Sequence, residues 1–149
     1  MRLQAEVDID AAPSDVYRFV ATDHFANHPS WDPSVVAMTQ TSPGPMRTGT
    51  TARVVRSDGG RRTEGVLTVT DYRPDHRFAV VVEFGPFRLD QRLSCSPGAT
   101  GGTHLVLGID SRAKGRLRLL LPLLRPRFAR TMQASLRSIK RQVEERAPH

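Results

Sequence analysis

The chain begins with a regular alternation of apolar and polar residues. Between residues 3 and 10, Leu3, Ala5, Val7 and Ile9 fall on one side of an extended backbone, and polar residues fall on the other. A period of two is typical of a β-strand with one buried face. We therefore expect the chain to open with a strand that covers part of a core.

The segment after this strand carries the signals of a helix start. Pro13 stands at a first-turn position, and Asp15 supplies the negative charge that a helix N-terminus favours. Val16, Phe19 and Val20 follow at the i, i+3, i+4 spacing of one helix face. These residues predict a short helix packed against the core.

Turn-forming residues divide the middle of the chain into short extended segments. Clusters such as PGP, SDGG, RPDH and SPGATGG recur at intervals typical of antiparallel strands joined by hairpins. In the extended segment near residues 62–72, Leu67 and Val69 lie on one face, but Val66 and Tyr72 lie on the other. A β-bulge would reconcile these two parities. We expect six strands, near residues 34–41, 50–57, 62–72, 77–84, 87–95 and 103–110.

The period becomes helical near the C-terminus. Apolar residues there recur at spacings of three or four and form one narrow stripe, with arginines outside it. A helix over residues 127–145 would be about 28 Å long, enough to cross a sheet of this domain. The stripe consists of Phe128, Met132, Leu136, Ile139 and Val143.

These elements define the α+β class of fold. We expect a curved, seven-stranded antiparallel sheet with one or two short helices after its first strand. The long C-terminal helix is the only element available to cover the apolar face of the sheet. The length suits one domain with its own core, so residues 1–149 are predicted to form a single domain.

Composition adds limits on location and partners. The single Cys95 cannot form an internal disulfide, and the first ten residues hold no apolar signal core. We therefore expect a cytoplasmic protein.

The net charge is +7, but from Arg112 to Arg146 the chain has eleven Lys or Arg against Glu144 and Glu145. This distribution predicts one basic face, and nucleic-acid binding is disfavoured because few aromatic residues remain outside the core.

Several motifs, in their order and spacing, resemble those of the helix-grip superfamily of START-like and Bet v 1-like domains, and within it the polyketide cyclase/dehydrase (SRPBCC) type. The resemblance spans nearly the whole chain. It implies that the sheet wraps around the C-terminal helix and leaves a cavity for a hydrophobic small molecule, with no cofactor. The motifs are IDAAPSDVYRFV (9–20), the segment from Asp23 to Trp31 with its WDP, GT (49–50), DYRP (71–74), GGT (101–103) and LRSIKRQVE (136–144).

The apolar parity of the strands predicts which residues would line that cavity. Gln91 is polar within an apolar row, so it is either a ligand contact or a group hydrogen-bonded to a neighbour. Trp31 lies between two prolines, either at the mouth of the cavity or as a plug that fills the core. The predicted ligand-binding residues are Trp31, Tyr72, Val80, Val82, Phe84, Leu89, Gln91, Leu105, Leu107, Phe128 and Met132.

Candidates for chemistry are few. His24 and His28 would share one face of a helical turn, but Pro29 is expected to end that turn and no third ligand has a fixed spacing, so no metal site is predicted. The absence of nucleophile-elbow, P-loop and dinucleotide motifs excludes the corresponding enzyme classes. For cyclase-type proton transfer, the candidate residues are Tyr72, Gln91, His28 and Asp23.

The segment GRLRLLLPLLRPRFAR (115–130) is rich in leucine and arginine. Pro122 and Pro126 favour a loop or short helix that tucks its leucines over the cavity. A second reading is an interfacial patch that inserts Leu119 and Leu123 into an anionic membrane, and a third is a homodimer interface.

These observations favour a carrier or sensor that binds a lipid- or polyketide-like molecule. The first alternative is a polyketide aromatase/cyclase-like enzyme, although the mainly aliphatic strands differ from an aromatic-rich pocket. The second alternative is a lipid-binding protein that associates with membrane surfaces.

Overall fold

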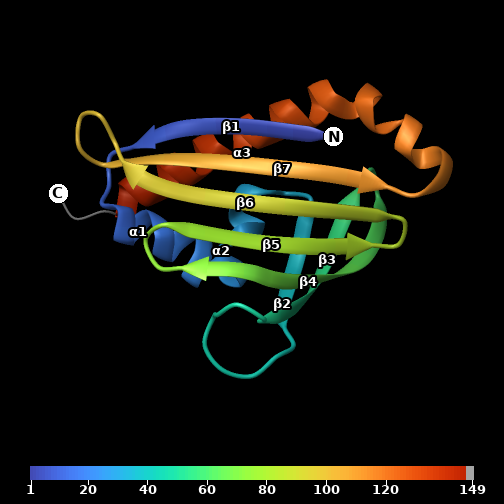
Figure 1. Ribbon diagram of the computed structural model, residues 1–149, viewed down its shortest axis with the longest axis horizontal. Helices are drawn as coiled ribbons and strands as arrows, with labels where there is room; N and C mark the ends of the chain where they lie inside the picture. The colour runs from blue at the N-terminus through green and yellow to red at the C-terminus, as the bar shows by residue number, and fades with distance from the viewer. Residues whose placement is uncertain (147–149) are drawn as a thin grey trace.

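A computed structural model describes residues 1–146 and shows a strongly curved sheet closed by one long helix (Figure 1). The sheet contains seven antiparallel strands in the order β1-β7-β6-β5-β4-β3-β2. The strands are β1 (Arg2–Ile9), β2 (Val35–Gln40), β3 (Thr51–Asp58), β4 (Arg61–Arg73), β5 (Arg77–Phe84), β6 (Phe87–Pro97) and β7 (Thr103–Ala113). The predicted α+β architecture is therefore confirmed.

The helices lie in two groups. After β1 come α1 (Pro13–Tyr17), the π-helical turn η1 (Arg18–Thr22) and α2 (His24–Trp31). After β7 come the short 3₁₀ helices η2 (Gly115–Leu119) and η3 (Leu121–Leu124), followed by α3 (Arg125–Arg146). In Figure 1, α3 runs along the edge strand β1, and its C-terminal end reaches the group formed by α1 and α2.

Turn chemistry sets the register of the hairpins. Gly59 and Gly60 form the two-residue connection between β3 and β4, and both have positive φ angles (59° and 81°). This is the backbone of a type I′ turn, which strongly favours glycine and matches the twist of the paired strands. In β4 the pairing with β5 shifts between Val69 and Asp71, which is the predicted bulge.

The core lies between the inner face of the sheet and α3. The apolar stripe of α3 packs there as predicted: Met132, Leu136, Ile139 and Val143 are buried, and Phe128 is half-buried. Leu136 and Ile139 each expose only 1% of their surface. Within residues 1–146, none of the helices combines the length and apolar character needed to cross a bilayer.

One local prediction was wrong. Helix α2 continues through Pro29 and ends at Trp31, so Trp31 is the last residue of a helix. Pro29 lacks the N–H that would bond to the carbonyl oxygen of Phe25, but its φ angle is close to that of a helix, and only two helical residues follow it. Pro126 likewise lies in the first turn of α3, where its missing N–H removes no helical bond.

Candidate functional site

The inner face of the sheet becomes partly accessible toward the N-terminal end of α3. Leu3 on β1, Ile109 on β7 and Gln91 on β6 lie side by side in register, and all three are half-buried. One step further along the sheet, Leu89 is also half-buried. The rows at the other end of the same strands, such as Leu105 and Leu107, are buried. The inner face of the sheet is therefore more accessible at this end than in the rows of Leu105 and Leu107.

Gln91 lies at the centre of this accessible region. Its neighbours across the sheet are Val80 on β5 and Ile109 on β7, so a single polar side chain stands in an apolar row. Within residues 1–146, its side-chain amide makes no hydrogen bond with another residue. A half-buried amide in such a setting is free to orient a bound molecule.

Most of the other predicted lining residues are packed into the core. Their role as ligand contacts stays a prediction, because their side chains are occupied with one another. The buried members are Val80, Val82, Phe84, Leu105, Leu107 and Met132, each exposing at most 9% of its surface, whereas Leu89, Gln91, Tyr72 and Phe128 are half-buried.

Trp31, the last residue of α2, is buried, with 4% of its surface exposed. Its indole stacks on the imidazole of His28 at 5.0 Å between ring centroids and packs at 5.4 Å from the ring of Phe19. This packing corresponds to the core-plug alternative. A ligand contact by Trp31 stays a prediction.

His24 and His28 form a buried chain of hydrogen bonds. His24 Nδ1–H donates to the carbonyl oxygen of Val20 at 2.8 Å, so His24 Nε2 accepts the proton of His28 Nδ1 at 2.9 Å. Burial, and then the neighbouring His28, lower the pKa of His24 from 6.5 to about 3. His24 is therefore a neutral structural group at physiological pH, and its two ring nitrogens are already occupied.

Asp32 lies at the end of this chain. His28 Nε2 is 3.6 Å from one carboxylate oxygen of Asp32, and the guanidinium of Arg56 is 3.5 Å from the same oxygen. Burial alone would raise the pKa of Asp32, but the bond from His28 and the charge of Arg56 outweigh it and hold that pKa below its usual value. The predicted candidate His28 is thus tied into a network that ends at a surface ion pair.

Tyr72 packs edge-on against Tyr17, with ring centroids 5.5 Å apart, and its hydroxyl lies 3.1 Å from the hydroxyl of Thr22. The hydroxyl of Tyr17 donates to the carbonyl oxygen of Arg77, and burial raises the pKa of Tyr17 well above its ordinary range. The two tyrosines therefore join β4 and β5 to the first helices. The catalytic roles considered for Tyr72, Gln91, His28 and Asp23 stay predictions.

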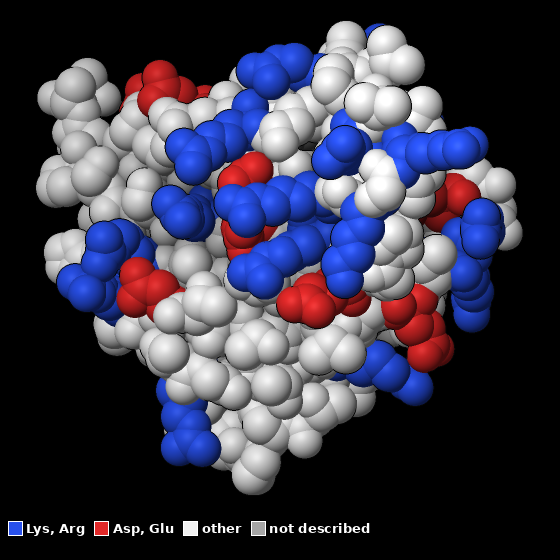
Figure 2. Space-filling model, turned by 45° about the vertical axis from the view of Figure 1, so that its right-hand side comes forward, with Lys and Arg blue, Asp and Glu red and all other residues white. Residues whose placement is uncertain are grey.

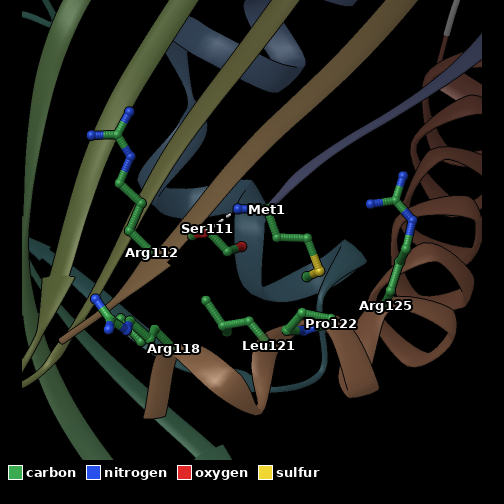
Figure 3. Close-up of a pocket in the computed structure, with 8 residues that line it drawn as sticks. Met1, Ser111, Arg112, Arg118, Leu121, Pro122 and Arg125 are labelled. Atoms are coloured by element: carbon green, nitrogen blue, oxygen red, sulfur yellow. Dashed lines mark hydrogen bonds between the residues drawn. The ribbon is translucent and has the colours of Figure 1, made fainter. Parts of the chain in front are cut away.

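A pocket of about 480 Å³ lies at the accessible end of the space between sheet and helix (Figure 3). It is bounded by the ends of β1 and β7, by η2 and η3, and by the first residue of α3. Its wall combines apolar side chains with arginines. The lining residues are Met1, Ser111, Arg112, Ala113, Arg118, Leu121, Pro122 and Arg125.

A second, smaller pocket of about 220 Å³ lies at the opposite end of α3. There the guanidinium of Arg146 stands 4.9 Å from the centroid of the Phe19 ring. Asp15 and Asp23 line the same pocket, so its wall carries acidic as well as basic side chains, whereas the side chains that carry charge in the first pocket are all basic. Asp23, a candidate for chemistry, therefore borders a shallow surface pocket near Val143.

The linker formed by η2 and η3 exposes most of its leucines. Leu119 and Leu123 expose 70% and 75% of their surface, and Leu120 and Leu124 expose 50% and 37%. The expectation that the leucines tuck over the cavity was therefore wrong for these four, and only Leu121 is buried. The linker is too short to cover the space and at the same time bury all of its leucines. Figure 2 shows Lys and Arg side chains gathered on the face that includes this end of the molecule.

Comparison with known proteins identifies the family to which the chain belongs. The family model described as polyketide cyclase/dehydrase and lipid transport matches residues 1–144, and the chain belongs to this family. A comparison with curated protein sequences gave no significant match.

The chain is similar in structure to several solved proteins. A START superfamily protein from Mycobacterium smegmatis superimposes with a TM-score of 0.78 at 16% identity, covering 97% of each chain. The Zhui aromatase/cyclase from Streptomyces sp. R1128 gives 0.77 at 15% identity, covering 98% of this chain and 94% of that one. Ara h 8.0201 gives 0.75 at 13% identity, covering 96% and 97%. At these identities the likeness establishes the helix-grip fold.

Sequence reasoning missed the arginines of the larger pocket. Arg118 and Arg125 belong to the basic segment, which the pattern assigned to a lid, a membrane patch or a dimer interface. Their convergence with Met1 and Ser111 depends on the path of the linker between β7 and α3. The alternation of basic and apolar residues in GRLRL was the one available signal.

Proposed function

We propose that the protein binds a hydrophobic small molecule, lipid- or polyketide-like, between the inner face of the sheet and α3, as a carrier or sensor. The observation that supports this proposal is the half-buried row Leu3, Ile109 and Gln91, which lies two residues along the strands from Met1 and Ser111 in the wall of a pocket of about 480 Å³. That volume lies in the range of small-molecule sites, which are mostly apolar with a few polar groups. The predicted cytoplasmic location stays a prediction.

Filling the groove tests this function. Ile109→Trp adds a large side chain to the inner face of β7, whereas Val106→Trp adds the same group to the outer face of the same strand. Binding of a fluorescent long-chain probe to the delipidated protein is measured by titration, with circular dichroism as a check of folding. Binding to the wild type and the Val106 variant but at least roughly tenfold weaker binding to the Ile109 variant is expected from steric exclusion. Equal binding to all three proteins would contradict the site.

A second candidate function, association with anionic membranes, is favoured by the exposed leucines. Leu119 and Leu123 project from the linker, which carries Arg116 and Arg118 and is followed by Arg125 at the start of α3. No Asp or Glu occurs in the sequence between Asp110 and Glu144. Apolar side chains that insert among acyl chains, flanked by cations that attract anionic headgroups, are the two components of interfacial binding. The charge of the segment therefore favours an anionic lipid surface as its partner.

Vesicle sedimentation tests this association. The wild type is compared with the double variant Leu119→Ser with Leu123→Ser and with Val66→Ser, which removes an exposed apolar residue on β4. We expect binding to phosphatidylglycerol-containing vesicles that weakens with salt and is lost in the double variant only. Equal binding of the wild type to neutral phosphatidylcholine vesicles would contradict the charge argument. A concentration-dependent doubling of mass that the double variant abolishes would instead assign the patch to a homodimer.

A further inference from the structure

The larger pocket has an apolar floor between two arginines from different elements. Figure 3 shows the side chains of Met1, Leu121 and Pro122 between Arg118 of η2 on one side and Arg125 of α3 on the other. Leu121 exposes only 6% of its surface, so it is part of the fixed wall, whereas both arginines are exposed. The pocket therefore joins an apolar surface to mobile cationic groups at its rim.

The charges at this rim are not balanced by the protein. Arg112, the third arginine of the pocket, donates to a carboxylate oxygen of Asp110 at 3.2 Å, and the same carboxylate also pairs with the N-terminal ammonium of Met1 and with Arg2. Among residues 1–146, by contrast, no ion pair involves Arg118 or Arg125, and no lining residue of the pocket is acidic. A guanidinium group without an acidic partner favours an anionic ligand, because charge-assisted hydrogen bonds to carboxylate or phosphate are the strongest that arginine makes.

The accessible part of the inner face begins one inward-facing pair of residues away from the pocket. The backbone N–H of Ser111, which lines the pocket, donates to the carbonyl oxygen of Met1 at 2.8 Å, and the next inward-facing pair along these strands is Leu3 and Ile109. Two residues of a strand span about 7 Å. An extended chain whose headgroup lies in the pocket would therefore need only a few methylene groups to reach Ile109 and then Gln91.

We propose that the ligand is a single-chain anionic amphiphile whose carboxylate or phosphate headgroup binds at the rim of the pocket, to Arg118 or Arg125, and whose hydrocarbon chain lies along the inner face of the sheet beneath α3. This inference rests on the proposed ligand-binding function and specifies its ligand class. A neutral amphiphile of equal length gains the apolar contacts but not the charge-assisted bonds. The headgroup, and not the chain, is therefore the source of selectivity at this end of the groove.

Isothermal titration with three ligands of one chain length separates headgroup from chain. Dodecanoic acid, dodecyl phosphate and dodecan-1-ol are titrated, below their aggregation limits, into the wild type, into Arg118→Gln with Arg125→Gln, and into Arg130→Gln with Arg137→Gln. The last protein removes two exposed arginines of α3 that do not line the pocket. We expect the wild type and this control to bind the acid or the phosphate at least about tenfold tighter than the alcohol. The pocket variant should lose that preference and bind the alcohol unchanged.

The outcomes distinguish the two proposals. If the alcohol binds as tightly as both anions in the wild type, or if the pocket variant keeps the preference for an anion, the headgroup site is refuted while the hydrophobic function stands. If none of the three ligands binds and the fluorescent probe also fails to bind, the function itself is refuted. A preference for the phosphate over the acid, or the reverse, identifies which anionic headgroup the site takes.

Discussion

Mild acidification should lower the free energy of unfolding of the wild type, and replacing His24 with glutamine should abolish most of that decrease. His24 is fully buried and neutral, and burial together with His28 lowers its pKa to about 3. In the unfolded chain the imidazole titrates near its ordinary pKa of about 6.5. Between these two pKa values the unfolded chain binds a proton that the folded protein does not, so the free energy of unfolding decreases as the pH decreases.

The size of this effect follows from the pKa difference. Each pH unit below the unfolded pKa lowers the free energy of unfolding by about 1.4 kcal/mol until the folded pKa is reached. Acidification from pH 7.5 to pH 5 goes about 1.5 units below the unfolded value, which predicts a loss of about 2 kcal/mol from His24 alone. Asp32 does not contribute in this range, because its lowered pKa makes its stabilisation disappear only as the pH falls below the ordinary carboxylate range, near 4.

Urea unfolding at the two pH values measures the loss. Trp31 is the only tryptophan and is buried, so its fluorescence reports unfolding, with circular dichroism as a second probe. His104→Gln is the matched control. Hydrogen bonds that His104 donates to Asp8 and then Glu6 raise its pKa, so its stabilisation is present at low pH and its removal cannot reduce the loss of stability in acid. The reasoning is refuted if the His24 variant loses as much stability as the wild type between pH 7.5 and pH 5.

Three further predictions concern packing and reactivity. Leu136→Ala should lower the free energy of unfolding by about 2–5 kcal/mol, because Leu136 is 1% exposed beneath the sheet, whereas the exposed Gln133→Ala should change it by less than about 0.5 kcal/mol in the same urea experiment. Gly65→Ala should cost about 1–3 kcal/mol, because the new methyl group would overlap the ring of Phe84 and stand 2.6 Å from the carbonyl oxygen of Glu83. Adding Phe84→Leu should recover part of this loss, and a neutral Gly65 variant would contradict the overlap. Burial raises the pKa of the Cys95 thiol to about 12, so a thiol reagent at pH 8 should label it only after unfolding in urea, and rapid labelling of the native protein would show that the strand opens.

The sheet and the long helix were predictable because their signals are local and repeated. The alternation in residues 3–10 and the turn clusters SDGG and RPDH determine strand faces and strand ends without knowledge of distant contacts. The bulge after Val69 was visible as a change of parity. In α3, the apolar stripe predicted the buried residues except Ser135, since one helix face must cover the sheet.

The path of α2 could not be predicted, because long-range packing decides it. The local rule for Pro29 ends the helix, but the stacked rings of His28 and Trp31 and the packing of Trp31 on Phe19 stabilise one more turn. Buried aromatic packing of this kind outweighs the loss of one helical hydrogen bond, which is worth about 1 kcal/mol. A sequence pattern cannot weigh the two, because Phe19 belongs to a different helix.

The path of the linker between β7 and α3 explains why the candidate site, too, could not be predicted from the sequence. In GRLRLLLPLL, Leu121 and the flanking Arg118 line the pocket, whereas Leu119 and Leu123 point to solvent. Neither a strand period nor a single helical period produces this division, because two 3₁₀ helices meet at Leu120 and redirect the chain. The same ten residues therefore carry an inner surface for a ligand and an outer surface for a membrane. Since Leu119 and Leu123 do not line the pocket, Leu119→Ser with Leu123→Ser should leave the binding of dodecanoic acid in solution unchanged while it abolishes vesicle binding. A joint loss would mean that the two surfaces act as one.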